Sequence, residues 1–198
     1  MIEDYLKKFC ENGKVNIIDI GCSGDSVREV IKEDGTYYIK QSTFGKLDKE
    51  YFINNYLKDR LSVPEVIYFG SGQGKSVMIT KKLKGDMICC DEIFDDMKQV
   101  VELSAKAIKT LQSVNVDNLI INNDLNKKLA LAKYNIDNNL VKISDMTEEN
   151  QKKFKSLQNA YEYLVNNKVS EDNLCLSHGD LSIPNIFYKD DKITGFLD

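Results

Sequence analysis

The chain has little of several residue types that common functional classes require. Among its 198 residues there are one histidine, two prolines and no tryptophan, and the five cysteines form no C-x-x-C pair. So few candidate ligands argue against a zinc or metal–thiolate centre. No apolar run approaches the roughly 18 residues of a membrane-spanning helix. With 42% hydrophobic residues, the sequence predicts a globular protein of one domain or two small lobes.

Location and partners are constrained by the N-terminus, the cysteines and the charge. The start at Met1–Tyr5 lacks the basic and apolar segments of a secretory signal, and the odd, scattered cysteines are expected to be reduced thiols. We therefore expect a cytoplasmic protein without a membrane partner. Thirty-one acidic residues against twenty-seven basic ones give a net charge of −4, which disfavours nucleic acid and permits a small cationic substrate.

The first part of the chain has the alternation of a small antiparallel sheet. Strands are expected at 15–20, 27–32, 36–40, 66–70 and 76–80. The first three are expected to form an antiparallel meander and the last two a hairpin around 71–74. Apolar residues at helical spacing predict one helix at 47–61, with acids early and bases late.

After Gly85 helical periodicity dominates. Helices are expected at 97–114, 123–134 and 148–167, followed by short strands at 174–176, 186–188 and 193–197. The fold class is therefore α+β. We expect an N-terminal β lobe at residues 1–84 and a mainly helical lobe at 85–198.

Three polar residues near the C-terminus have a spacing suited to phosphoryl transfer. Asp180 lies five residues before Asn185, which lies thirteen before Asp198. One carboxylate can orient or deprotonate an attacking hydroxyl, while an amide oxygen and a second carboxylate can hold Mg²⁺ beside nucleotide phosphates. In the purely structural alternative, Asp180 caps a turn, Asn185 satisfies backbone groups and His178 is packed.

Two features of the first lobe fit the same chemistry. Lys40 ends a predicted strand and Glu50 follows early in the predicted helix, so a glutamate could fix an ammonium group for nucleotide phosphates. The small-residue turn Gly21–Ser26 could bring backbone amides to a phosphate. Solvated side chains and an ordinary hairpin turn are the alternatives.

Taken together, these motifs resemble the aminoglycoside phosphotransferase family, and most closely the 3′-phosphotransferases. The resemblance rests on Lys40, Glu50, the run from His178 to Phe187 with its Asp180 and Asn185, and Phe196-Leu197-Asp198. It extends in order over almost the whole chain. It implies the two-lobed fold of protein kinases and phosphate transfer from ATP or GTP to an aminoglycoside hydroxyl.

The resemblance also implies a role for each residue. Asp180 would be the catalytic carboxylate, Asn185 and Asp198 would bind Mg²⁺, and Lys40, oriented by Glu50, would contact nucleotide phosphates. The phosphates would be covered by Ser23, Gly24, Asp25 and Ser26, and adenine would meet backbone groups near Thr80, Lys81 and Leu83. His178 would shape the loop.

The acceptor is less constrained. Asp145, Glu148 and Glu149 lie where the resemblance implies an acidic substrate loop, although Thr147-Glu148-Glu149 is also ordinary helix-start chemistry. Another small alcohol as acceptor, or a nucleotide-binding fragment without catalysis, remain as alternatives. Because the family continues past the second metal-binding Asp, we expect the chain to be a piece of a longer enzyme cut after Asp198. Lys81-Lys82 departs from the acidic residue expected after Thr80.

Overall fold

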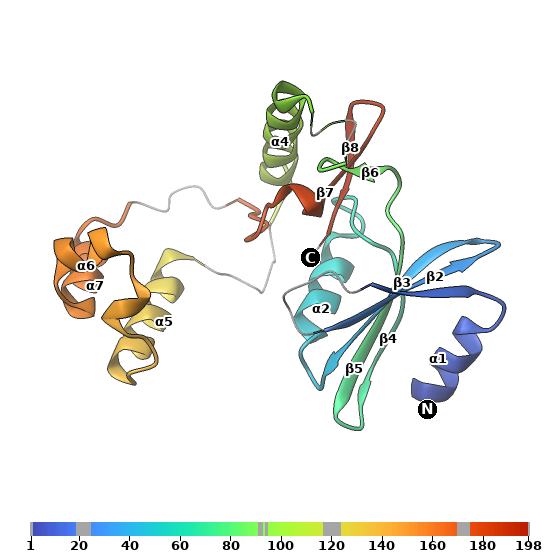
Figure 1. Cartoon of the computed structure of the whole chain (residues 1–198), viewed down its shortest axis with the longest axis horizontal. Helices are drawn as coiled ribbons and strands as arrows, with labels where there is room; N and C mark the ends of the chain where they lie inside the picture. The colour runs from blue at the N-terminus through green and yellow to red at the C-terminus, as the bar shows by residue number, and fades with distance from the viewer. Residues whose placement is uncertain are drawn as a thin grey trace. The chain divides into compact units, whose positions relative to one another are not determined.

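The chain forms two compact units in the computed structural model. One comprises residues 1–115 with 175–198, and the other residues 116–174 (Figure 1). The structure describes residues 2–18, 25–90, 93, 95–116, 124–169 and 175–197. Within these ranges, no helix combines the length and the apolar character needed to cross a bilayer. Ser23, Gly24 and Asp198, for which roles are expected, lie outside the described residues.

A five-stranded antiparallel sheet forms the first part of the larger unit. Its strands are β1 (Lys14–Ile18), β2 (Ser26–Lys32), β3 (Gly35–Thr43), β4 (Val66–Gly72) and β5 (Lys75–Lys81). They lie in the order β1-β2-β3-β5-β4, which confirms the five predicted strands and the antiparallel meander of the first three, except that residues 19–20 of the first predicted strand lie outside the described residues. The β4–β5 hairpin turns at Gln73 and Gly74, whose φ angles of 53° and 80° suit a tight turn that matches the strand twist.

Side chains alternate between the two sides of this sheet, and the set that points to the back face is largely apolar. A cluster built around Val30, Ile39, Val77 and Ile79 is completed by Leu6 of helix α1 (Ile2–Cys10). The expectation for residues 1–84 contained a single helix, so α1 is a correction (Figure 1).

Helix α2 (Asp48–Leu57) packs on the front face, where Tyr51 stacks on Phe69 of β4 with ring centroids 4.2 Å apart. The helix was predicted to run to residue 61. It ends at Leu57, and in the turn that follows the N–H groups of Arg60 and Leu61 both donate to the carbonyl of Leu57.

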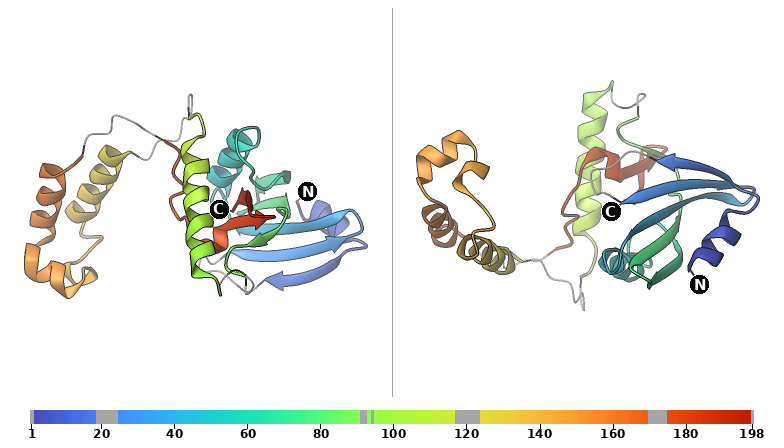
Figure 2. Two further views of the ribbon diagram at one scale, coloured as in Figure 1. Left: turned by 90° about the horizontal axis from the view of Figure 1, so that it is seen from above. Right: turned by 60° about the horizontal axis from the view of Figure 1, so that its bottom comes forward.

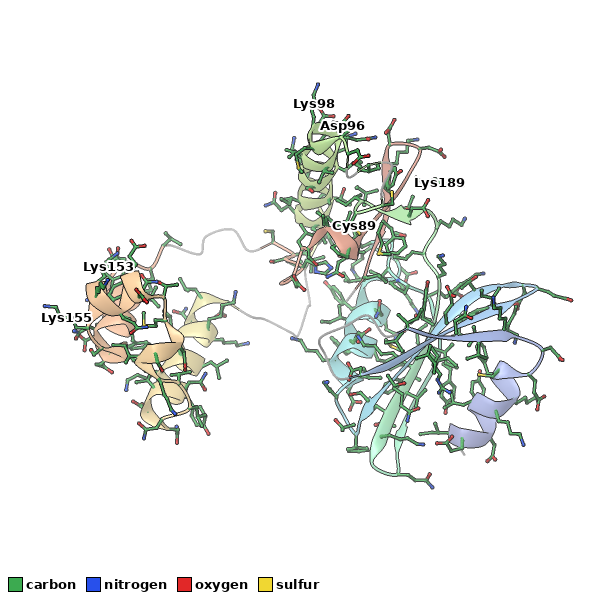
Figure 3. All side chains as sticks on the ribbon, in the orientation of Figure 1. Cys89, Asp96, Lys98, Lys153, Lys155 and Lys189 are labelled. Atoms are coloured by element: carbon green, nitrogen blue, oxygen red, sulfur yellow. The ribbon has the colours of Figure 1, made fainter. Side chains whose placement is uncertain are left out.

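The rest of the larger unit is a long helix against a small sheet. Helix α4 (Met97–Gln112) contacts β7 (Ile186–Lys189) and β8 (Lys192–Phe196), which pair antiparallel with each other and, through β7, with β6 (Asp86–Met87) (Figure 2). Asp96 caps α4 by accepting from two backbone N–H groups of its first turn (Figure 3).

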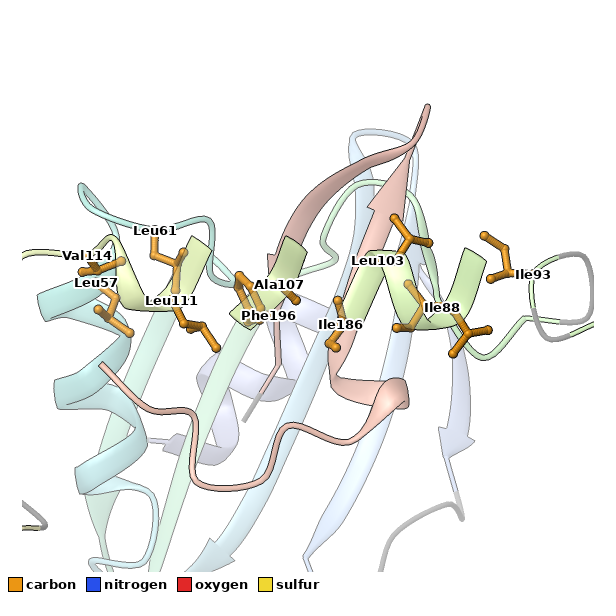
Figure 4. Packing of buried hydrophobic residues seen from close by; sticks show 11 residues of the cluster. Leu57, Leu61, Ile88, Ile93, Leu103, Ala107, Leu111, Val114, Ile186 and Phe196 are labelled. Carbon is orange, nitrogen blue, oxygen red and sulfur yellow. The ribbon is translucent and has the colours of Figure 1, made fainter. Parts of the chain in front are cut away.

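One apolar cluster joins α2, α4 and the small sheet. Leu57 and Leu61 lie at the end where α4 presents Leu111, and Ile186 and Phe196 extend the cluster along α4 (Figure 4). Both predicted strands of the β7–β8 hairpin are confirmed. The predicted strand at 174–176 is wrong for residues 175 and 176, which have no regular structure.

The smaller unit is helical. It contains α5 (Leu125–Asp137), the short 3-10 helix η1 (Ile143–Asp145), α6 (Glu148–Phe154) and α7 (Leu157–Asn166). A single helix over 148–167 was predicted, and this is wrong. Lys155 has a left-handed φ of 64° that ends α6, and the hydroxyl of Ser156 then caps α7 (Figure 3).

Candidate active site

An ion pair joins the centre of the sheet to α2. Lys40 lies on β3 between Val27 of β2 and Met78 of β5. Its Nζ is 2.9 Å from Oε2 of Glu50, in the first turn of α2, and the two side chains are only 20% and 23% exposed. The structure thus brings together two residues that are ten positions apart, and partial burial fixes the direction of the ammonium group.

A second ion pair, between Asp25 and Lys46, lies beside Ser42, which is two residues further along the same strand. The Asp25 carboxylate accepts from the hydroxyl of Ser42 at 2.5 Å and from Nζ of Lys46 at 2.9 Å. Asp25 is the last residue before β2, and its side chain is only 4% exposed. The carboxylate is therefore directed to the end of β3 and the turn after it. Ser26, the next residue, begins β2 opposite Gln41.

A row of polar side chains crosses the front face beside Lys40, and sequence reasoning missed it. Glu29 accepts from Nδ2 of Asn16 at 3.0 Å and from the hydroxyl of Tyr38 at 3.2 Å. These residues are direct neighbours on β1, β2 and β3. Burial, followed by the nearby Glu29 carboxylate, raises the pKa of Tyr38 to about 12. The sequence did contain one signal for this row, because the alternation of side chains along β3 puts Tyr38 and Lys40 on one face.

The segment after β5 is bound both to the sheet and to the β7–β8 hairpin. The N–H groups of Lys81 and Lys82 donate to the carbonyls of Glu65 and Thr36, each at 2.9 Å. Thr80 continues the ladder opposite Tyr38. Among the described residues, none accepts a hydrogen bond from the N–H of Leu83. This N–H can therefore serve a ligand.

The side chain of Leu83 lies on β8. A Cβ added at Gly195 would come 2.7 Å from a methyl group of Leu83, so any other residue there would force the Leu83 side chain to shift. Next to it, the hydroxyl of Thr194 donates to the carbonyl of Lys84 at 2.6 Å. The segment that leaves the large sheet is thus held against the strand that leads to Asp198.

The loop before β7 brings Asp180 and Asn185 together. Nδ2 of Asn185 donates to the backbone carbonyl of Asp180 at 3.0 Å, and the backbone N–H of Asn185 donates to Ser182 at 2.9 Å within the 3-10 helix η2 (Ile183–Asn185). The Asp180 residue is exposed. Use of the Asn185 amide nitrogen inside the loop leaves its oxygen for another partner.

The end of β8 is fastened to the same loop. The N–H of Leu197 donates to the carbonyl of Asn185 at 2.9 Å, and the N–H of Phe196 donates to the carbonyl of Ser62 at 3.1 Å. Asp198 lies outside the described residues, but its covalent neighbour Leu197 is hydrogen-bonded to Asn185. Residues that are twelve positions apart in the sequence, Asn185 and Leu197, are therefore in direct contact.

The side chain of His178 is held by packing against an aromatic ring. Its ring lies 6.2 Å from the ring of Phe196, tilted by 48°. Its Nδ1 is buried and has no hydrogen-bond partner among the described residues. This position agrees with a role in shaping the loop, and nothing in the described part of the chain aligns the imidazole for proton transfer.

The expected metal ligands fit a hard cation by chemistry. Amide and carboxylate oxygens are what Mg²⁺ prefers, and the Asn185 oxygen is oriented by the bond that its nitrogen makes to the loop. Within the described residues, no three His, Cys, Asp or Glu side chains form a metal-binding group. The expected site would not belong to such a group, because its two protein ligands are the amide oxygen of Asn185 and the carboxylate of Asp198.

The acidic residues expected at the substrate lie in the smaller unit. Asp145 accepts from the backbone N–H of Lys142 at 2.8 Å, which closes η1. Glu148 and Glu149 occupy the first turn of α6 and are exposed, behind the cap provided by Thr147. Each thus has a local role at a helix start, which the alternative interpretation of this stretch predicts, and this role leaves the two glutamates accessible to solvent.

Comparison with known proteins agrees with this geometry. A family model described as "Phosphotransferase enzyme family" (APH) matches residues 14–198. An aminoglycoside 3′-phosphotransferase of Enterococcus faecalis is 29% identical, over 100% of this chain and 77% of the relative. One of Staphylococcus aureus is 30% identical over the same shares.

Solved structures agree on the fold. The crystal structure of an aminoglycoside-3′-phosphotransferase of type VIII has a TM-score of 0.72 at 18% identity, covering 99% of this chain and 75% of that one. Aminoglycoside phosphotransferase APH(4)-Ia has a TM-score of 0.74 at 13% identity, covering 100% and 70%. The predicted α+β, protein-kinase-like fold is thereby confirmed. From the match over residues 14–198, the chain belongs to the phosphotransferase enzyme family (APH), and its relatives are small-molecule kinases.

Proposed function

We propose that this protein transfers the γ-phosphoryl group of ATP or GTP to a hydroxyl of an aminoglycoside. The observation that carries the proposal is the Asp180–Asn185 loop, with its exposed carboxylate, its oriented amide and its bond to Leu197 at 2.9 Å. The relatives named above are aminoglycoside 3′-phosphotransferases. Two neighbours of the same fold were solved with ADP and hygromycin B and with ADP and streptomycin.

Asp180 acts on the acceptor in this proposal. A carboxylate that stands exposed at a loop can accept a hydrogen bond from a sugar hydroxyl and align it for in-line attack on the γ-phosphorus. As the P–O bond to the leaving ADP breaks, the hydroxyl proton passes to the Asp180 oxygen. His178, whose Nδ1 is enclosed and whose ring faces Phe196, holds the loop in place.

The nucleotide is held from both sides. Lys40, fixed by Glu50, meets the phosphates, and Ser23, Gly24, Asp25 and Ser26 make up the covering turn. Mg²⁺, bound by Asn185 and Asp198, would neutralise the charge of the β- and γ-phosphates. The protein's own contribution is to orient the Asn185 oxygen through the hydrogen bond that Nδ2 of Asn185 donates to the Asp180 carbonyl.

The purine belongs beside the segment after β5. Because Lys81 and Lys82 use their N–H groups within the sheet, the N–H of Leu83 is the donor that a base can reach there, next to Thr80. Tyr38, opposite Thr80 and on the face of Lys40, offers an aromatic surface for stacking.

The two functional lobes of the proposal are residues 1–84 and 85–198, with the nucleotide between them. For the acceptor, we propose that Asp145, Glu148 and Glu149 supply negative charge to the ammonium groups of the aminoglycoside. The exposure of both glutamates supports this assignment.

Product formation tests the proposal directly. Residues 1–198 are incubated with Mg-ATP or Mg-GTP and a panel that contains kanamycin, another aminoglycoside and unrelated small alcohols, and products are identified by mass spectrometry. Phosphorylated kanamycin is expected, with a loss of at least about 1000-fold in Asp180→Ala. Asp59→Ala, an exposed acid after α2, is the matched control and should keep the parent rate.

Three outcomes would contradict the proposal in different ways. An Asp180→Ala protein that phosphorylates kanamycin at the parent rate removes Asp180 from catalysis. Products formed only from other alcohols change the acceptor class. Stabilisation by Mg-nucleotide without any product assigns the chain to nucleotide binding alone.

A further inference from the structure

The acidic residue Asp25 poses a problem at a phosphate-binding turn. A carboxylate close to a nucleotide triphosphate repels it, and the repulsion between unit charges is strong where water is partly excluded. Asp25 adjoins the turn proposed to cover the phosphates. Its partner Ser42 is two residues from Lys40 on the same face of β3, so their Cα atoms are about 7 Å apart. The site therefore needs a way to cancel this charge.

Lys46 provides the opposite charge. Its Nζ lies 2.9 Å from the Asp25 carboxylate, which is 4% exposed, while Lys46 itself is 47% exposed. The hydroxyl of Ser42 donates to the same carboxylate oxygen at 2.5 Å. Because the carboxylate is the buried partner, loss of the lysine would remove a positive charge that lies 2.9 Å from an enclosed negative one.

The turn that carries Lys46 is braced from the core. The N–H of Gly45 donates to the hydroxyl of Ser76 at 2.9 Å, and Ser76 is fully buried. The hydroxyls of Ser76 and Ser71 are 2.8 Å apart, and the N–H of Phe44 donates to the carbonyl of Gly74 at 3.0 Å. A buried polar group thus fixes the turn on which the ammonium group stands.

We propose that Lys46 is a charge-compensating positioning residue, which with Ser42 holds the Asp25 carboxylate neutralised beside the nucleotide so that a polyphosphate can bind. The inference rests on the proposed nucleotide site. Lys46 acts through Asp25, whereas Lys40 contacts the phosphates. In this proposal the two ion pairs have opposite arrangements. The lysine on β3, Lys40, is directed to the ligand, whereas Lys46, in the turn after β3, screens an acid from it.

The test is a series of ligands that differ in charge. Dissociation constants of Mg-AMPPNP, Mg-ADP and adenosine are measured by calorimetry on residues 1–198. Lys46→Met should weaken Mg-AMPPNP about tenfold, Mg-ADP less, and adenosine not measurably, and the loss should shrink in high salt. Lys46→Arg should bind as the parent does. Lys49→Met, an exposed lysine of α2, is the matched control without effect.

A double variant separates this role from direct phosphate contact. In Asp25→Asn/Lys46→Met the enclosed charge is gone, so Mg-AMPPNP affinity should return to within about threefold of the parent. A double variant as weak as Lys46→Met overturns the inference, as does an equal loss for adenosine and Mg-AMPPNP. A parent chain that binds no nucleotide refutes the proposed function itself, whereas parent binding with an unchanged Lys46→Met refutes only this inference.

Discussion

The two faces of the five-stranded sheet differ in almost every respect, although the same strands build both. On the back face, Ile39, Val77 and Ile79 are fully buried and covered by α1. On the front face, Lys40 and Ser42 alternate with those residues and join ion pairs and hydrogen bonds. Apolar burial contributes stability in proportion to area, whereas oriented charges contribute function. In the proposed function, consecutive residues of one strand therefore divide these two tasks.

The largest expected effect comes from the front face. Lys40→Met should lower kcat/KM for phosphorylation by about 100- to 1000-fold, because a preorganised charge is lost while the side chain keeps its length. The thermal midpoint should change little, since a partly exposed ion pair adds modestly to stability. Steady-state kinetics and calorimetric unfolding of the same preparation measure both. If the thermal midpoint fell together with activity, Lys40 would contribute to stability as the back-face residues do, and the contrast between the two faces would be lost.

The back face should give the opposite result one residue away. Ile39→Ala should lower the free energy of unfolding by about 3 kcal/mol, because Ile39 is fully buried and its truncation leaves a cavity. Urea denaturation measures the loss, and activity per folded molecule should stay within about twofold of the parent. Ile17→Ala, at a position 80% exposed on β1, is the control with little effect. Activity lost beyond the unfolded fraction would show that the faces are coupled.

The sequence predicted the parts of the fold that local patterns encode. Alternation and turn residues located all five strands of the large sheet and the β7–β8 hairpin. Helix α1 was missed because its segment was considered only as a possible signal, although Ile2, Leu6 and Phe9 have helical spacing. The break at Lys155 had no such signal, because a left-handed residue without glycine interrupts an otherwise continuous periodicity.

The candidate site divides in the same way. Motif spacing predicted roles for Asp180, Asn185, Lys40 and Glu50, and the structure brings them together as two pairs. The spacing gave no indication of Ser42, which meets Asp25 across 17 residues, because such contacts depend on strand register rather than on spacing. Register also decides that Leu83, rather than Lys81 or Lys82, has the N–H left for a ligand.

The smallest effect concerns Tyr38, a partly buried residue of the front face. Burial raises its pKa to about 12 from 10, with help from Glu29. The folded chain holds this proton more tightly than the unfolded chain. The resulting stability is therefore complete below pH 10 and is lost as the pH rises from about 10 towards 12. In Tyr38→Phe this loss should be absent.

Absorbance of ionised tyrosine checks this prediction. At about pH 11, with circular dichroism showing a folded chain, Tyr38→Phe should remove almost no tyrosinate signal, because Tyr38 is still mostly protonated. Glu29→Gln should bring the Tyr38 pKa closer to 10, since it removes the nearby negative charge. Loss of a full tyrosinate equivalent in Tyr38→Phe at this pH would mean that the front face around Tyr38 is open to water, and the contrast between the faces would then be one of charge alone.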